Sequence, residues 1–136
     1  EMCIRDSANS SGGPASMSAI GSDAVADNNL VLHAEGMPTN QFGYFVASLT
    51  QGFVPNPGGS QGNLCILGNM ARFNSQIANS GAGGSISALI DINAIPLGTG
   101  PVGIAPGETW NFQAWFRDLN PTTTSNFTDG IAITFQ

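Results

Sequence analysis

The stretch WNFQAWFR, residues 110–117, decides the fold class because its side chains alternate between two kinds. Four apolar side chains share one face of an extended chain: Trp110, Phe112, Ala114 and Phe116. The other face is mixed and carries Asn111, Gln113, Trp115 and Arg117. A period of two is the period of a β-strand, so this stretch is predicted to be a strand with one buried face.

A second alternating stretch follows and extends this prediction. Ile131, Ile133 and Phe135 alternate with small or polar residues, so residues 131–135 are predicted to form another strand with one buried face. Residues 118–130, which join the two strands, are rich in Asp, Asn and Thr. We therefore expect a hairpin of a layered β domain.

Short alternating or apolar runs recur along the rest of the chain. They predict strands over residues 17–20, 30–35, 42–49, 64–67, 71–73, 85–93 and 102–104. Eighteen glycines and eight prolines lie mostly between the runs, and residues 51–63 are predicted to form a long Gly/Pro loop. About seven to nine short strands without a helical period predict an all-β fold. We expect a single-domain antiparallel β-sandwich over residues 8–136, either immunoglobulin-like or jelly-roll-like.

The composition limits the classes of binding partner. The 136 residues carry nine Asp and Glu, no lysine and three arginines, Arg5, Arg72 and Arg117, for a net charge of −6. Nucleic-acid binding requires a cluster of cations, and anionic membrane surfaces attract basic segments, so neither partner is expected. No apolar run reaches the roughly 18 residues of a membrane-spanning helix, so we expect no membrane insertion.

The composition of residues 1–7, EMCIRDS, differs from that of the rest of the chain. They resemble a translated transposase adapter of the kind used in sequencing libraries. We therefore predict that they are a non-native leader and that the chain is a metagenomic fragment. The native domain is then expected over residues 8–136.

The chain has two cysteines, Cys3 and Cys65. An even number of cysteines in a lysine-free, turn-rich chain indicates a secreted protein with one disulfide bond. Cys65 lies within the apolar run 64–67, where a small buried thiol is the alternative. Cys3 belongs to the predicted leader. A Cys3–Cys65 disulfide and a buried Cys65 thiol are both left open.

The mixed face of the first strand is the candidate ligand site. Trp115 places an aromatic plane among three planar hydrogen-bonding side chains, Asn111, Gln113 and Arg117. Such a mixture binds sugar rings through stacking and polar contacts. The alternative is that this face packs under a loop, in which case the four residues are structural.

The polar segment after this strand is a candidate cation site. It offers side-chain oxygens at Asp118, Asn120, Asn126 and Asp129. Calcium prefers about six to eight oxygen ligands from side chains and carbonyl groups. Asp and Asn also stabilise turns by bonding to their own backbone, which is the alternative. Calcium is the one possible ion, and no other cofactor is expected.

Residue types that carry catalysis are scarce. The chain has one histidine, no lysine and one tyrosine. No spacing in the sequence supports a Ser-His-Asp arrangement or a zinc cluster. We therefore expect that the protein is not an enzyme.

Three parts of the chain together resemble a known type of domain. They are NQFGYFVASLTQGFVPNPGGSQGNLC (residues 40–65), RFNSQIANSGAGG (residues 72–84) and the closing PGETWNFQAWFRD with TSNFTDGIAITF. These segments resemble an uncharacterised β-rich domain at the C-terminal end of large secreted proteins from planctomycete-type environmental bacteria. Members carry a Tyr-Cys pair before the equivalent of Asn9, and the resemblance implies that this cysteine pairs with Cys65. Cys3 lies near that position.

The resemblance implies an extracellular or cell-surface location. We expect a non-catalytic accessory module at the C-terminal end of a larger secreted bacterial protein, serving display, anchoring or sorting. The alternative is a carbohydrate-binding module that uses the Trp115 face and is stabilised by calcium. The expected partners are upstream domains of the same polypeptide, and a polysaccharide or the cell envelope.

Overall fold

The computed structural model describes residues 8–136, and the described chain is all-β. The first strands are β1 (Ser16–Ile20), β2 (Val31–Glu35), β3 (Phe42–Ser48), β4 (Thr50–Pro55), β5 (Asn63–Leu67), β6 (Ala71–Arg72) and β7 (Ala78–Asn79). The others are β8 (Ile86–Leu89), β9 (Ile95–Leu97), β10 (Gly100–Val102), β11 (Thr109–Leu119), β12 (Thr123–Phe127) and β13 (Ile131–Thr134). Three short 3-10 turns interrupt them, η1 (Val25–Asp27), η2 (Pro57–Gly59) and η3 (Asn74–Gln76).

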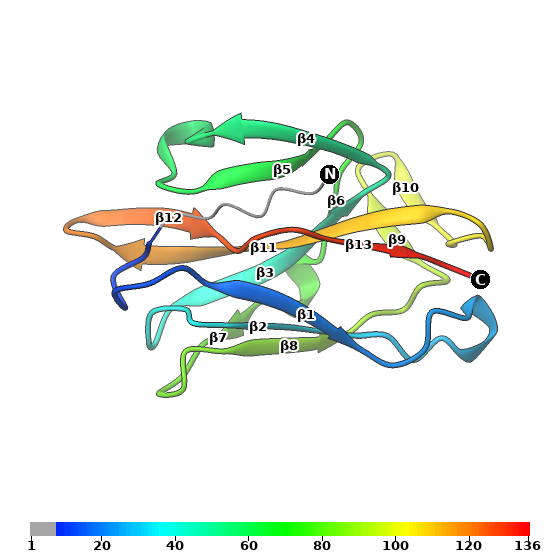
Figure 1. Ribbon diagram of the computed structural model, residues 1–136, viewed down its shortest axis with the longest axis horizontal. Coiled ribbons are helices and arrows are strands. Elements are labelled where there is room, and N and C mark those ends of the chain that lie inside the picture. The colour runs from blue at the N-terminus through cyan, green and yellow to red at the C-terminus, as the bar shows by residue number, and fades with distance from the viewer. Residues whose placement is uncertain (1–7) are drawn as a thin grey trace.

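The strands form three antiparallel sheets that lie as layers (Figure 1). The central sheet has the strand order β10-β9-β6-β3-β11-β12, and β13 and β7 add to β11 and β3. A three-stranded sheet, β1-β2-β8, lies on one side of it, and the β4–β5 ribbon lies on the other. The predicted antiparallel β-sandwich is confirmed.

The core fills the space between the three-stranded sheet and the central sheet. It contains large side chains from both layers, including Leu32, Phe45, Ile86, Trp110, Phe112 and Phe116. Burying such a side chain stabilises a fold by about 1.5–3 kcal/mol. The apolar face predicted for residues 110–117 is thereby confirmed, since its four side chains are at most 1% exposed.

Strand β11 organises the central sheet because it pairs along both of its edges. One edge pairs with β3, from Asn111 to Phe116. The other edge is shared, because β13 pairs with residues 109–112 and β12 with residues 115–119. The predicted polar connection over residues 118–130 is therefore wrong in part: residues 118–119 continue β11 and residues 123–127 form β12.

The predicted loop over residues 51–63 is also corrected, since most of its first half belongs to β4. This strand pairs with β5, with a bulge between Gln51 and Val54. Gly52 is required by the partner strand rather than by a turn, because a Cβ atom there would lie 2.2 Å from the Leu67 side chain. Only the turn around η2 remains as loop, and it holds Pro57 over the outer face of the central sheet.

Two smaller features complete the fold. Cys65 is buried and disulfide-bonded. Its predicted partner Cys3 and the rest of the predicted leader lie outside the described residues. Among the described residues, no helix is long and apolar enough to cross a membrane.

Candidate functional site

A hollow of about 310 Å³ opens on the face of the central sheet that points away from the core. Its floor consists of side chains from three neighbouring strands: Tyr44, Val46, Trp115 and Phe127. Pro57 and Leu64 of the β4–β5 ribbon form one wall, and Arg72 of β6 lies at the opposite side of β3 from Trp115. The hollow therefore exists because the ribbon covers only part of this sheet face.

An aromatic pair forms the centre of the floor. Tyr44 and Trp115 are direct partners across β3 and β11, so the register of the sheet holds them side by side. Their ring centroids are 5.3 Å apart and their planes are inclined by 40°. Both side chains are partly exposed. The pair is a bent aromatic platform that a ligand can reach from solvent.

The guanidinium groups of Arg117 and Arg72 lie next to this platform or in the lining of the hollow around it. The guanidinium carbon of Arg117 lies 5.6 Å from the centre of the Trp115 ring, within the range of a cation–π contact. Arg72 lines the hollow, and both arginines are exposed. Within residues 8–136 the ion pair present joins His33 and Glu35, so neither arginine is neutralised by a carboxylate.

Asn111 does not contribute to the hollow, although the sequence placed it on the ligand face. Its side chain is 1% exposed because the start of β4 covers it. The amide Nδ2 donates to the carbonyl oxygen of Ser48 at 3.0 Å, and Oδ1 accepts from Gln51 Nε2 at 3.0 Å. Asn111 thus fastens the ribbon to the sheet.

Gln113 has the same role further along β11, and its side chain is fully buried. Its Oε1 accepts from the backbone N–H of Cys65 at 3.0 Å. Its Nε2 donates to the carbonyl oxygens of Asn63 and Thr128, at 2.8 and 2.7 Å. Of the four residues expected on the ligand face, the structure therefore leaves Trp115 and Arg117 open to a ligand.

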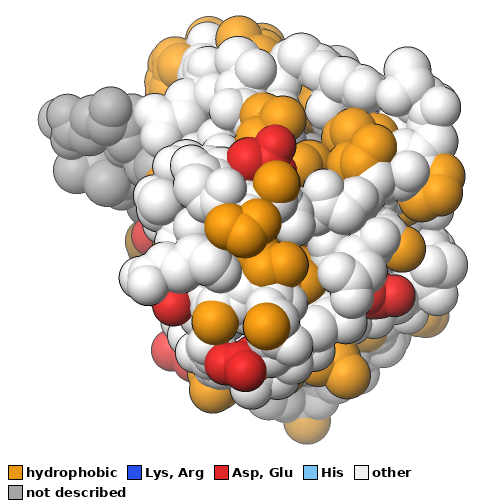
Figure 2. Space-filling view, turned by 90° about the vertical axis from the view of Figure 1, so that its right-hand side faces the viewer, with side chains coloured by type: hydrophobic (Ala, Val, Ile, Leu, Met, Phe, Trp, Pro, Cys, Tyr) orange, Lys and Arg blue, Asp and Glu red, His pale blue; other side chains and the backbone are white. Residues whose placement is uncertain are grey.

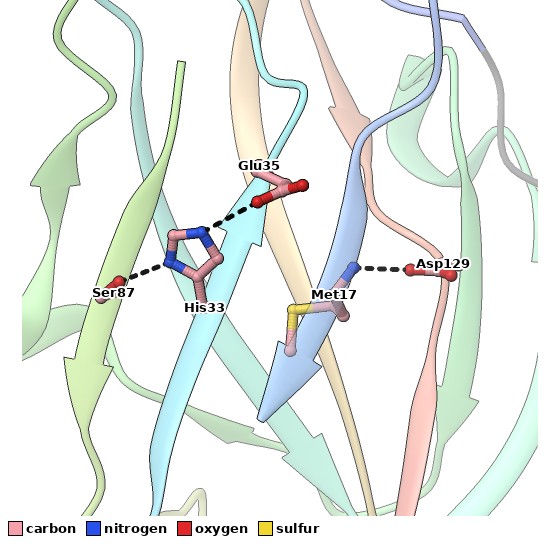
Figure 3. Close-up of polar contacts among 5 residues, drawn as sticks. All are labelled: Met17, His33, Glu35, Ser87 and Asp129. Atoms are coloured by element: carbon pink, nitrogen blue, oxygen red, sulfur yellow. Dashed lines mark hydrogen bonds and ion pairs between the residues drawn. The ribbon is translucent and has the colours of Figure 1, made fainter. Parts of the chain in front are cut away.

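Three of the four residues expected to hold calcium are hydrogen-bonded to the N-terminal segment. Asp118 is buried and accepts hydrogen bonds from the Ser10 backbone N–H, at 3.0 Å, and from the Ser10 hydroxyl. Asp129 accepts from the Met17 backbone N–H at 2.7 Å (Figure 3). Asn126 donates to the carbonyl oxygen of Ala8 at 3.2 Å.

These contacts define a clamp, formed by Asp118, Asn126 and Asp129, that holds β1 and the segment before it against β11, β12 and the residues that follow β12. Asn120 contributes its backbone, whose carbonyl accepts from Gln61. The described residues contain no group of three or more His, Cys, Asp or Glu arranged to hold a metal ion. Calcium stays a prediction, and Asp118 and Asp129 already accept hydrogen bonds from the N–H groups of Ser10 and Met17.

The structure also brings together a serine, a histidine and a carboxylate, an arrangement that the sequence spacing did not indicate. His33 Nδ1 lies 2.7 Å from Ser87 Oγ, and His33 Nε2 lies 3.2 Å from Glu35 Oε1 (Figure 3). The pairing of β2 with β8 places His33 opposite Ser87, which no local pattern reveals. This row lies on the outer face of the three-stranded sheet, and the residues of the hollow are elsewhere.

The fold is thus an antiparallel β-sandwich whose central sheet has one face in the core and one face only partly covered by a ribbon. Comparison with protein-family models, with curated proteins and with solved structures gives no match for this chain. The functional argument therefore rests on the geometry of the hollow and its side chains.

Proposed function

We propose that the chain is a non-catalytic accessory module of a larger secreted bacterial protein, and that it anchors that protein by binding carbohydrate in the hollow. The observation that carries this proposal is the Tyr44–Trp115 platform, which is partly exposed on the floor of a hollow of about 310 Å³. This volume lies at the lower end of the range for small-molecule sites, roughly 300–1,000 Å³. It fits a short part of a sugar chain.

The chemistry of the lining suits a sugar. A sugar ring offers apolar C–H faces, which pack on aromatic rings, and hydroxyl groups, which require hydrogen-bonding partners. The platform supplies the rings, and the Tyr44 hydroxyl and the Arg72 guanidinium supply polar groups at its edge. The inclination of 40° between the rings gives a seat that is bent rather than flat.

The expected extracellular location rests on a resemblance. The segments over residues 40–65 and 72–84 resemble a domain of secreted bacterial proteins. At an extracellular location, the expected partner is a polysaccharide of the surroundings or of the cell envelope.

A glycan array followed by calorimetry on the best ligand tests carbohydrate binding. The native chain is expected to bind, and Trp115→Ala is expected to abolish binding because it removes half of the platform. Phe53→Ala is the control, since Phe53 is an exposed aromatic residue that lies outside the hollow. Binding that survives Trp115→Ala, or no binding to any glycan, contradicts the proposal.

The non-catalytic part of the proposal has its own test. The Ser87–His33–Glu35 row has the order of a nucleophile, a base and a carboxylate, so ester and glycoside hydrolysis should be measured directly. We expect no turnover above the uncatalysed rate, because these side chains lie on an open sheet face rather than in a cleft that positions a substrate. Turnover that is lost in His33→Ala would contradict this expectation.

A further inference from the structure

We infer that the sugar bound in the hollow carries a carboxylate, and that Arg72 is the residue that selects it. This inference rests on the proposed carbohydrate binding and goes one step further, to the class of sugar. The predicted ligand is a chain in which a uronic acid residue lies among neutral sugars.

The first argument is the placement of charge. The chain has no lysine, and the arginines of its described part are Arg72 and Arg117. Both accompany the same aromatic platform, although the net charge of the chain is −6. The end of the molecule at which the carboxyl terminus lies shows apolar and acidic side chains and no lysine or arginine (Figure 2). The hollow is thus a local cationic region on an acidic protein.

The described residues supply no carboxylate that neutralises either guanidinium group. Within the described residues neither guanidinium forms an ion pair, since the pair present joins His33 and Glu35. A guanidinium group has five N–H donors and no acceptor, and it forms its strongest contacts with carboxylates and phosphates. Two exposed guanidinium groups that form no ion pair with a described carboxylate, beside a ligand seat, favour an anionic ligand group.

Arg72 and Arg117 lie on different strands, so they have different positions relative to Trp115. Across the sheet the order is β6-β3-β11, so Arg72 and Trp115 lie on opposite sides of β3. Neighbouring strands are about 4.8 Å apart, so the two backbones are roughly 10 Å apart. Arg117 lies over the Trp115 ring, whereas Arg72 makes no such ring contact and lines the hollow. A sugar on the platform therefore presents its substituent to Arg72.

Two considerations favour an isolated carboxylate over a dense polyanion. The planar fork of a guanidinium matches the two oxygens of a carboxylate, which allows paired hydrogen bonds. The chain has a net charge of −6, which opposes the binding of a ligand with many negative charges. A single uronic acid among neutral sugars satisfies both conditions.

The test uses three related ligands with the 136-residue chain. The first is a xylose oligosaccharide with one glucuronic acid residue, the second is its carboxyl-reduced form, and the third carries a sulfate in place of the carboxylate. Calorimetry is expected to show binding of the acid about tenfold tighter than binding of the reduced form, because a charge-assisted hydrogen bond is lost on reduction. The sulfated form is expected to bind less tightly than the acid, because a sulfate monoester is a weaker hydrogen-bond acceptor than a carboxylate.

Arg72→Gln isolates the selecting residue. It is expected to remove the preference for the acid, so that this variant binds the acid and its reduced form with equal affinity. Ser18→Glu is the control, because it changes the net charge by the same amount at an exposed position of β1, on the other sheet. It should keep the preference, and its loss there would assign the preference to overall charge instead of Arg72.

The outcomes separate this inference from the proposed function. Equal affinity for the acid and its reduced form, both lost in Trp115→Ala, overturns the inference and leaves carbohydrate binding intact. Equal or tighter binding of the sulfated form overturns the choice of a carboxylate. Binding of none of these sugars, together with an empty glycan array, overturns the proposed function itself.

Discussion

The guanidinium carbon of Arg117 lies 5.6 Å from the centre of the Trp115 ring, so the one partly exposed tryptophan of the protein has a cation over its face. The other tryptophan, Trp110, is 1% exposed and lies in the core, where its Nε1–H donates to Glu108 at 3.1 Å. The two rings differ in access and in local charge. Because of these differences, the fluorescence of Trp115 can report on the candidate site in the ligand-free protein.

Quenching of tryptophan fluorescence tests this arrangement. Iodide is an anion and acrylamide is neutral, so only iodide is attracted to the cation above Trp115. Arg117→Gln is expected to lower the iodide quenching constant by up to about fivefold, since a unit charge in water contributes under about 1 kcal/mol beyond 4 Å and 1.4 kcal/mol corresponds to a factor of about ten. The acrylamide constant should not change. An equal fall with both quenchers would show that the variant alters access to the ring rather than charge.

Gln113 is predicted to be more important for stability than an exposed amide. Gln113→Met keeps the volume but leaves the Cys65 N–H and two carbonyl groups without this partner. Each buried group without a hydrogen bond costs about 1–3 kcal/mol, so we expect the three groups together to lower the free energy of unfolding, measured in urea, by at least about 3 kcal/mol. Gln76→Met is the control: it removes one contact of an exposed amide, to the carbonyl oxygen of the exposed Leu89, and should change stability by less than about 1 kcal/mol. A similar loss in both variants would contradict the role assigned to Gln113.

The core face of β11 could be predicted because the alternation of residues 110–117 involves only neighbouring positions in the sequence. The sequence did not reveal β12, whose residues 123–127 are mostly Thr, Ser and Asn. That strand exists because β11 offers a free edge. The predicted loop over residues 51–63 was wrong in part for a similar reason, since the missing side chain of Gly52 makes room for Leu67 of the partner strand rather than for a turn.

The candidate site was predictable only in part for the same reason. Trp115 and Arg117 could be assigned to one face of a strand from their spacing alone. The partnership of Trp115 with Tyr44, and the position of Arg72, depend on which strands become neighbours. The burial of Asn111 and Gln113 depends on the ribbon that folds over them. Contacts between distant segments of this kind leave no periodic signal in the sequence.

The clamp on the N-terminal segment is predicted to consist of separable anchors. Asp118→Ala removes the acceptor of the Ser10 N–H, and Asp129→Ala removes the acceptor of the Met17 N–H. A hydrogen bond to a charged group contributes about 1.5–3 kcal/mol, so exchange of the affected amide should accelerate about tenfold or more. Hydrogen exchange resolved by NMR measures both amides in each variant. Acceleration at both amides in either variant would show one cooperative unit instead of two anchors.

Two glycines with similar backbone angles are predicted to differ sharply in their tolerance of a side chain. Gly81 and Gly84 have φ angles of +60° and +66°, so an alanine at either position adopts a left-handed conformation, at about 1–2 kcal/mol. A Cβ atom at Gly81 meets open space, but at Gly84 it would lie 2.3 Å from the Met37 carbonyl oxygen. The Gly84 carbonyl also accepts from the Met37 N–H at 2.9 Å, which holds the two segments together. Gly84→Ala should therefore unfold at a clearly lower urea concentration than Gly81→Ala, and equal midpoints would contradict the close packing of these segments.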